Sequence, residues 1–112
     1  MFGRSHRFHG HNALAPVYKR GSTVRGAQIS LKFVGRGGDR PYRVAVVVSR
    51  KVNKSAVVRN RIRRRIYEAV RISGSVPAGY DLIFTVFHDQ VADWPAAKLS
   101  AQISELLDKI AA

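Results

Sequence analysis

The spacing of apolar side chains along the chain predicts a small set of strands and helices. Residues 27–34 alternate apolar and polar side chains, which is typical of a half-buried strand. Residues 42–49 are apolar on both parities, which favours a central strand covered on both faces. Because the glycine-rich turn at residues 35–39 separates these segments, we expect them to pair as a hairpin.

Helical spacing follows in the second half of the chain. Ser55 is a candidate N-cap, and the apolar stripe after it ends at the Ser-Gly-Ser stop of residues 73–75. Residues 80–87 predict a third, buried strand, and a last helix is expected with Asp93 as N-cap and Pro95 in its first turn. The apolar positions of the two helices are Val58, Ile62, Ile66, Ala69 and Val70, then Leu99, Ile103, Leu106, Leu107 and Ile110.

The first twenty residues divide into a tail and a short helix. Residues 1–12 show no periodicity, and we expect a mobile basic tail; residues 13–20 predict a short helix that Gly21 ends. The order helix, strand, strand, helix, strand, helix predicts an α+β fold, an α-β sandwich of helices on one small mixed sheet. A chain of 112 residues accommodates one domain, which we place at residues 13–112.

Charge narrows the choice of partner. The chain has 20 Lys+Arg against 7 Asp+Glu, and residues 1–71 hold 18 of those cations with only Asp39 and Glu68 as acids. Nucleic acid is the leading partner, because cationic side chains release counterions when they bind phosphates. An anionic membrane surface is the second candidate, but it requires large apolar anchors opposite the basic face. The sequence has no stretch of about 18 apolar residues and no signal peptide, so we expect a soluble, cytoplasmic protein with no membrane partner.

Candidate chemistry within the chain is sparse. The absence of cysteine excludes disulfides, thiolate zinc sites and cysteine nucleophiles. The seven acids form no pair along the chain that would indicate acid-base catalysis, so no catalytic residue is predicted. His6, His9 and His11 have a spacing that can bind a transition metal, but a solvated tail is the favoured interpretation and no metal site is predicted.

The basic stretch at residues 51–66 is the strongest candidate for a binding surface. Most charge runs are solvated helix faces, but here arginine outnumbers lysine, Asn60 lies among the arginines, and the acids that would form i, i+4 pairs are nearly absent. Arginine's planar fork suits bidentate contact with phosphate and stacking on bases. The pattern therefore indicates a nucleic-acid interface, and it leaves the choice between RNA and DNA open.

Three segments together resemble a known family. Residues 47–51 (VVSRK), residues 56–64 (AVVRNRIRR) and residues 77–81 (PAGYD) are similar to the protein subunit of bacterial ribonuclease P. The order of elements agrees with that family from about Leu14 to Ile110. The resemblance implies a left-handed crossover through the arginine helix, whereas physical preference alone favours a right-handed one.

The resemblance also implies which tasks belong to a partner RNA and which belong to the protein. The catalyst would be a partner RNA with its own Mg²⁺ ions, and the protein itself would bind none. The chain would bind this RNA and the 5′ leader of precursor tRNA, would promote removal of the leader, and would need no protein partner.

The family's functional positions carry over onto two groups of residues. The implied RNA-binding residues are Ser49, Arg50, Lys51, Lys54, Arg59, Asn60, Arg61, Arg63, Arg64 and Tyr67. The implied leader cleft, between the first helix and the sheet, contains Leu14, Tyr18, Lys32 and Val46. Leu14 and Lys32 stand where the family commonly has aromatic residues that stack on bases.

Two other classes of function fit parts of this pattern. A structural RNA-binding protein, such as a ribosomal protein, shares the basic composition and a similar sandwich. A stand-alone nuclease would need carboxylates in its own chain, and Glu68 and Asp81 are the candidates for that role. The RNA recovered with the protein distinguishes the first alternative, and cleavage by RNA-free protein distinguishes the second.

Overall fold

The fold comprises three α-helices, one 3₁₀ helix and four strands among the described residues. The computed structural model describes residues 6, 8, 13–38, 40–74 and 76–110. The elements in chain order are α1 (Ala15–Arg20), β1 (Ser22–Arg25), β2 (Ile29–Gly35), β3 (Arg43–Val48), α2 (Ala56–Ser73), β4 (Tyr80–Val86), the 3₁₀ helix η2 (Asp89–Asp93) and α3 (Ala96–Asp108).

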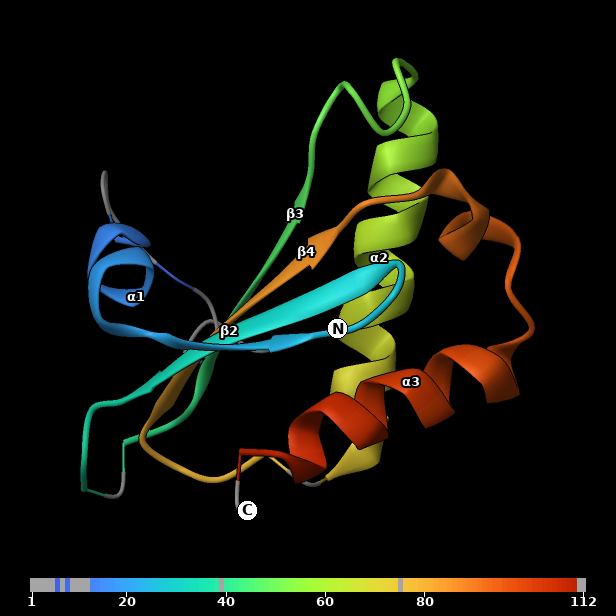
Figure 1. The fold of residues 1–112 in the computed structure, drawn as a ribbon. Helices are drawn as coiled ribbons and strands as arrows, with labels where there is room; N and C mark the ends of the chain where they lie inside the picture. Colours follow the sequence, from blue (N-terminus) through green and yellow to red (C-terminus); the bar gives the residue numbers. More distant parts are fainter. Residues whose placement is uncertain (1–5, 7, 9–12, 39, 75, 111–112) are drawn as a thin grey trace.

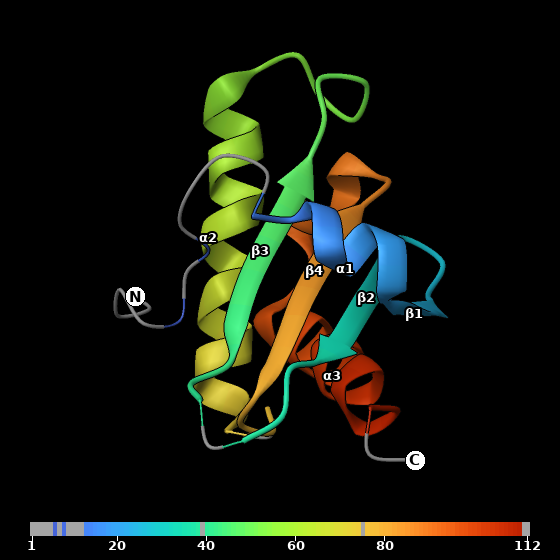
Figure 2. The ribbon, with the colours of Figure 1, turned by 90° about the vertical axis from the view of Figure 1, so that its left-hand side faces the viewer.

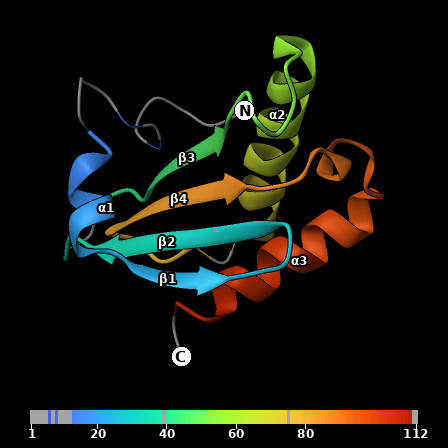
Figure 3. The same cartoon turned by 45° about the horizontal axis from the view of Figure 1, so that its top comes forward.

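The strands form one mixed sheet in the order β1-β2-β4-β3. β4 pairs antiparallel with β2 and parallel with β3, and β1 pairs antiparallel with β2 (Figure 3). Helices α2 and α3 cover one face of the sheet, and α1 lies on the other (Figure 1). The predicted α-β sandwich is confirmed.

The predicted hairpin and the predicted central strand are both wrong. β4 lies between β2 and β3, so the strands on either side of the glycine turn do not pair with each other. β3 lies at one edge of the sheet, and its side chains alternate between buried and half-buried. The two interior strands are β2 and β4, and β4 carries the longer run of buried residues. The pattern also missed β1, which is only four residues long and mostly exposed.

The connection from β3 through α2 to β4 is left-handed. Figure 2 shows the two parallel strands pointing upward with β4 to the right of β3 and α2 behind the sheet. A right-handed connection would place the helix in front of the sheet in this view, as nearly all such crossovers do. The handedness that the family resemblance implies is therefore confirmed.

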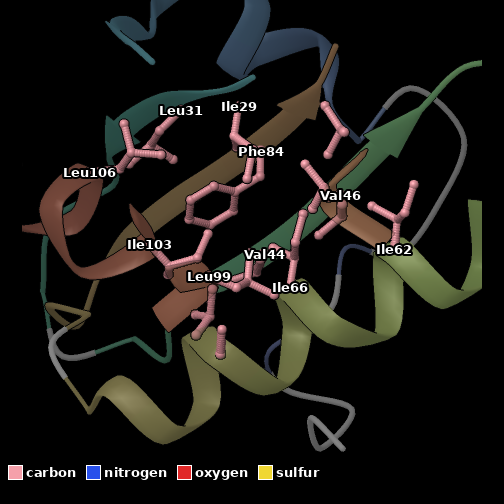
Figure 4. Close-up of a cluster of buried hydrophobic side chains, with 14 of the residues drawn as sticks. Ile29, Leu31, Val44, Val46, Ile62, Ile66, Phe84, Leu99, Ile103 and Leu106 are labelled. Atoms are coloured by element: carbon pink, nitrogen blue, oxygen red, sulfur yellow. The ribbon is translucent and has the colours of Figure 1, made fainter. Parts of the chain in front are cut away.

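The main core lies between the sheet and its two long helices. Phe84 of β4 lies at its centre, with Ile62 and Ile66 from α2 and Ile103 and Leu106 from α3 (Figure 4). All five side chains are fully or almost fully buried. The apolar stripes predicted for the two helices are thus the faces that pack on the sheet.

The ends of the helices follow local sequence signals in one case and depart from them in another. The Ser55 hydroxyl accepts a hydrogen bond from the backbone N–H of Val58 at 3.3 Å, which confirms the predicted N-cap of α2. Gly74 ends α2 in the left-handed conformation with φ of 63°. Asp93 does not cap α3: it ends η2, and Pro95 occupies the N-cap of α3.

A buried ion cluster ties β3, β4 and the loop before β3 together. Asp81 of β4 is almost fully buried and accepts hydrogen bonds from Arg43 Nε at 2.9 Å and Arg43 Nη2 at 2.7 Å. Arg36 Nε lies 2.8 Å from the same carboxylate, and Arg36 Nη2 donates to the Pro41 carbonyl at 2.7 Å. The hydrogen bonds to Asp81 raise the pKa of Arg43 above its usual value.

The predicted mobile tail, residues 1–12, lies outside the described residues except at two positions. His6 Nδ1 lies 2.8 Å from the Tyr42 carbonyl oxygen, and the two rings stack with centroids 4.1 Å apart. Phe8 lies under the Arg43 guanidinium, 4.7 Å from its central carbon to the ring centroid. At these two positions the segment contacts the start of β3.

We predict that Ile62→Asp unfolds the domain. The substitution places an unpaired charge in the fully buried stripe of α2 and removes apolar contacts, at a cost of about 4 kcal/mol or more. Circular dichroism and urea unfolding measure the effect. Val57→Asp is the matched control, since Val57 is 78% exposed on the same helix, and we expect it to remain folded. A folded Ile62→Asp variant of ordinary stability would contradict the packing of α2.

We predict that Asp81→Asn lowers the free energy of unfolding by about 3 kcal/mol, because it leaves Arg36 and Arg43 together without a counter-charge. Thermal unfolding at neutral pH measures the loss. Glu68→Gln is the control: it breaks the exposed pair with Arg71, and no measurable change is expected. Equal effects of the two substitutions would show that burial of the Asp81 cluster is energetically unimportant.

Candidate nucleic-acid interface

The largest concentration of cations lies on the loop after β3 and the first half of α2. We call this surface the basic face. It consists of Arg50, Lys51, Lys54, Arg59, Asn60, Arg61, Arg63 and Arg64, with Ser49 at the point where β3 ends. All of these residues are exposed or half-buried. The opposite side of α2 is held in the core, so the helix presents the basic face outward.

The loop that carries part of the basic face is held in place by Asn53. Its Oδ1 accepts a hydrogen bond from the Ser55 backbone N–H at 2.8 Å, and its Nδ2 donates to Asp89 Oδ2 at 3.1 Å. Arg59 Nη1 donates to the carbonyls of Asn53 and Lys54 at 3.0 and 2.9 Å. Arg59 was predicted to bind RNA, and part of its hydrogen-bonding capacity serves this loop.

Carboxylates neutralise little of the basic face. Arg61 is 62% exposed and lies 3.9 Å from Asp93, the one acid paired with the basic face among the described residues. Arg63 donates to the Asn60 side-chain oxygen and so has a neutral partner. Glu68 pairs with Arg71 beyond the basic face, and the hydrogen bond from Arg71 lowers the pKa of Glu68. The cations of the basic face therefore remain available to an external polyanion.

Two residues of α2 that lie beside this surface, Arg65 and Tyr67, contact other parts of the fold. The Arg65 guanidinium donates to the backbone carbonyls of Val91 and Ala92 at 2.7 and 2.8 Å, and to that of Trp94. This satisfies carbonyls at the end of η2 and joins that segment to α2. Tyr67, predicted to bind RNA, is half-buried and packs against the core.

A second candidate surface is the face of the sheet on which α1 lies, which we call the open face. Strand alternation places Lys32 of β2 on it, with Ala45 and Val47 of β3. Figure 2 shows α1 across the strands, with the loop that leads to α2 above it. The open face and the basic face therefore meet near the carboxyl end of β3.

Tyr18 of α1 is an exposed aromatic residue on the open face. Its side chain is 47% exposed, and Lys32 Nζ lies 5.9 Å from its ring centroid. Val17 of the same helix is fully buried and anchors α1 on the sheet, while Leu14 is half-buried at the start of α1. Tyr18 thus lies beside Lys32 of β2, with Leu14 at the start of the same helix, and the leader cleft stays a prediction.

Val46 does not share this region. It is 7% exposed and belongs to the core, where it points toward Ile62 of α2 (Figure 4). Successive side chains of a strand point to opposite faces, so its neighbours Ala45 and Val47 face α1 instead. The expectation that Val46 lines the leader cleft is corrected accordingly.

Sequence reasoning did not select three further cations near the open face. Lys19 and Arg20 are exposed in the last turn of α1, and Arg25 is exposed on β1. The available signal was their position directly after Tyr18, in a stretch of 38 residues without a single acid.

A metal site and a membrane-spanning helix are two further features that the described part of the chain could contain. Residues 13–38, 40–74 and 76–110, with His6 and Phe8, include no group of three His, Asp or Glu side chains placed to hold a metal ion. Within the same residues, no helix is both long enough and apolar enough to span a membrane.

Comparison with known sequences identifies a family over almost the whole chain. The family model for ribonuclease P matches residues 2–111. The ribonuclease P protein component of a Synechococcus strain is 35% identical over 115 residues, which cover 97% of this chain and 84% of that protein. The one from Symbiobacterium thermophilum is 30% identical, over 95% of this chain and 91% of that protein. The match to the Brevibacillus brevis component, at 38% identity, spans 64% of that protein's length.

Solved structures show the same fold. The RNase P protein from Staphylococcus aureus has a TM-score of 0.73 at 23% identity, over 96% of each chain. The RNase P protein from Thermotoga maritima has a TM-score of 0.75 at 22% identity, over 86% of this chain and 89% of that one. Sequence and fold together confirm the resemblance noted in the arginine segment, and this chain belongs to the ribonuclease P protein family.

Proposed function

We propose that this chain is the protein component of a ribonuclease P and acts in the cytoplasm in removing the 5′ leader from precursor tRNA. Its basic face would bind the catalytic RNA, and its open face would hold the single-stranded leader. The observation that carries the proposal is the basic face itself, where arginines are displayed outward with almost no carboxylate to neutralise them. The names of the relatives support the same assignment and do not favour a ribosomal protein.

The two acids considered for a stand-alone nuclease, Asp81 and Glu68, are both engaged within the fold, which supports a binding role. Asp81 is enclosed by Arg36 and Arg43, so its carboxylate is committed to an ion cluster. Glu68 is engaged with Arg71, and Asp89 accepts a hydrogen bond from Asn53. Since a general base needs a carboxylate free to accept a proton, we place the catalytic steps and the Mg²⁺ ions on the partner RNA.

The side chains of the two surfaces suit the binding of the catalytic RNA by one and of the leader by the other. Guanidinium groups on a helix bind the phosphates of a folded RNA at several points. A strand surface with an exposed aromatic ring suits unpaired bases, which stack on such rings. The two surfaces meet near the carboxyl end of β3, so one chain can hold the RNA and the leader close together.

Reconstitution tests the proposed function. Full-length protein is combined with a bacterial ribonuclease P RNA and a precursor tRNA at low Mg²⁺, and cleavage of the 5′ leader is measured. We expect cleavage only when RNA and protein are both present, because the protein's cations reduce the Mg²⁺ needed to assemble the complex. Cleavage by the protein without the RNA, abolished by Glu68→Gln, would contradict the assignment of catalysis to RNA.

We predict that Arg64→Ala weakens binding to the catalytic RNA about three- to tenfold and reduces the slope of log K against log salt by about 0.7–0.9, the value for one phosphate contact. Arg64 lies outside the buried stripe, so circular dichroism should show an intact fold. Lys109→Ala is the matched control, since it removes one exposed charge at the end of α3. Equal salt slopes for wild type and Arg64→Ala would exclude Arg64 from the interface.

A further inference from the structure

A groove on the outside of the molecule lies between α2 and α3, at the edge of the basic face. It has a volume of about 530 Å³, which is within the range of pockets that hold small molecules. Ala69 of α2 and Leu99 of α3 contribute apolar walls, and Ile72 lies at the edge with 66% of its surface exposed. The groove stays open because α3 contributes small side chains at Ala96 and Ser100.

The groove is continuous with the basic face. Arg64 belongs to that face and also lines the groove, next to Tyr67. Arg61 lies three residues earlier, which places it one turn away on the same side of α2. A strand of RNA whose phosphates contact Arg61 and Arg64 therefore runs along the mouth of the groove.

We propose that this groove accepts an unpaired nucleobase of the RNA bound on the basic face. The proposal rests on the proposed function, because it requires RNA phosphates at Arg61 and Arg64. A base has large apolar faces and is covalently tied to a phosphate, so it needs an apolar slot beside a guanidinium group. The groove has that combination in Ala69 and Leu99 with Arg64 at the rim.

Charge favours RNA over other occupants. The Arg64 side is positive, and Glu68, the carboxylate in the groove wall, is already paired with Arg71. A membrane surface would need several exposed apolar anchors, and Ile72 is the large apolar side chain exposed at this edge. An apolar base attached to a phosphate chain matches both the lining and the charge.

Direct binding to two RNA probes tests the proposal. The probes are a decamer of adenosines and a decamer with the same sugar-phosphate backbone but no bases. Affinities are measured by fluorescence anisotropy with the full chain in a Tyr18→Ala background, which removes the exposed ring of α1. We expect the adenosine decamer to bind about tenfold more tightly, in the range for stacking of a base.

Variants that fill the groove identify where the base is bound. Ser100→Trp should reduce the tenfold preference to less than about twofold while the affinity for the base-free decamer stays unchanged. Ala101→Trp is the matched control: it adds the same side chain at an exposed position of α3 outside the groove, and the preference should persist. Ala96→Trp is a second filling variant, used if circular dichroism shows that Ser100→Trp does not fold.

The outcomes separate this inference from the proposed function. A tenfold preference that survives in a folded filling variant would overturn the groove as the base site, as would equal binding of the two probes. Equal and tight binding would leave the basic face intact as a phosphate-binding surface and the groove open to a protein segment. Failure of the Tyr18→Ala chain to bind either probe would overturn this inference, whereas the proposed function is decided by the reconstitution with the catalytic RNA.

Discussion

The structure depends on one helix that must satisfy opposite demands on its two sides. One side of α2 is buried against the sheet through Ile62 and Ile66, and the other displays arginines that repel one another. Burial of apolar surface has to exceed that repulsion for the domain to fold alone. The repulsion is relieved when a polyanion binds, so the charge that opposes folding is the same charge that favours assembly with RNA.

The left-handed crossover determines where this charge is displayed. Because β3 is at the sheet edge and runs parallel to β4, the chain leaves its carboxyl end and returns through α2 on one face only. The loop after β3 and the first half of α2 thus lie beside the open face. The cluster of Asp81 with Arg36 and Arg43 holds the two parallel strands together at their other end. A binding surface on a rigid sheet and one on a rigid helix are thereby held in constant relation.

Local signals in the sequence predicted most of the helices and strands, but they could not predict which strands pair. The Ser55 cap and the apolar stripe of α2 depend on neighbours within a few residues, so both could be predicted. Which strands pair depends on contacts between distant segments. The glycine turn before β3 therefore indicated a hairpin that the sheet does not contain. The apolar side chains of residues 42–49 predicted burial on both faces, but β3 is an edge strand with one buried and one half-buried face.

The candidate site shows the same difference between local and nonlocal signals, here for single side chains. The basic face could be predicted because charge on one side of a helix follows directly from helical spacing. Arg65 could not be separated from its neighbours, since its role depends on carbonyls of η2 that lie 26 and more residues away. Val46 was misplaced because a one-residue step along a strand moves a side chain to the opposite face.

The distribution of charges also limits what the basic face can do. A carboxylate placed among the arginines would be neutralised by ion pairing and would weaken the attraction for phosphate. The acids of the chain lie outside the basic face, and Glu68, the acid carried by α2, is paired with Arg71, so the basic face keeps a strong positive charge. A strong positive field for RNA and an unpaired carboxylate are therefore incompatible within the basic face.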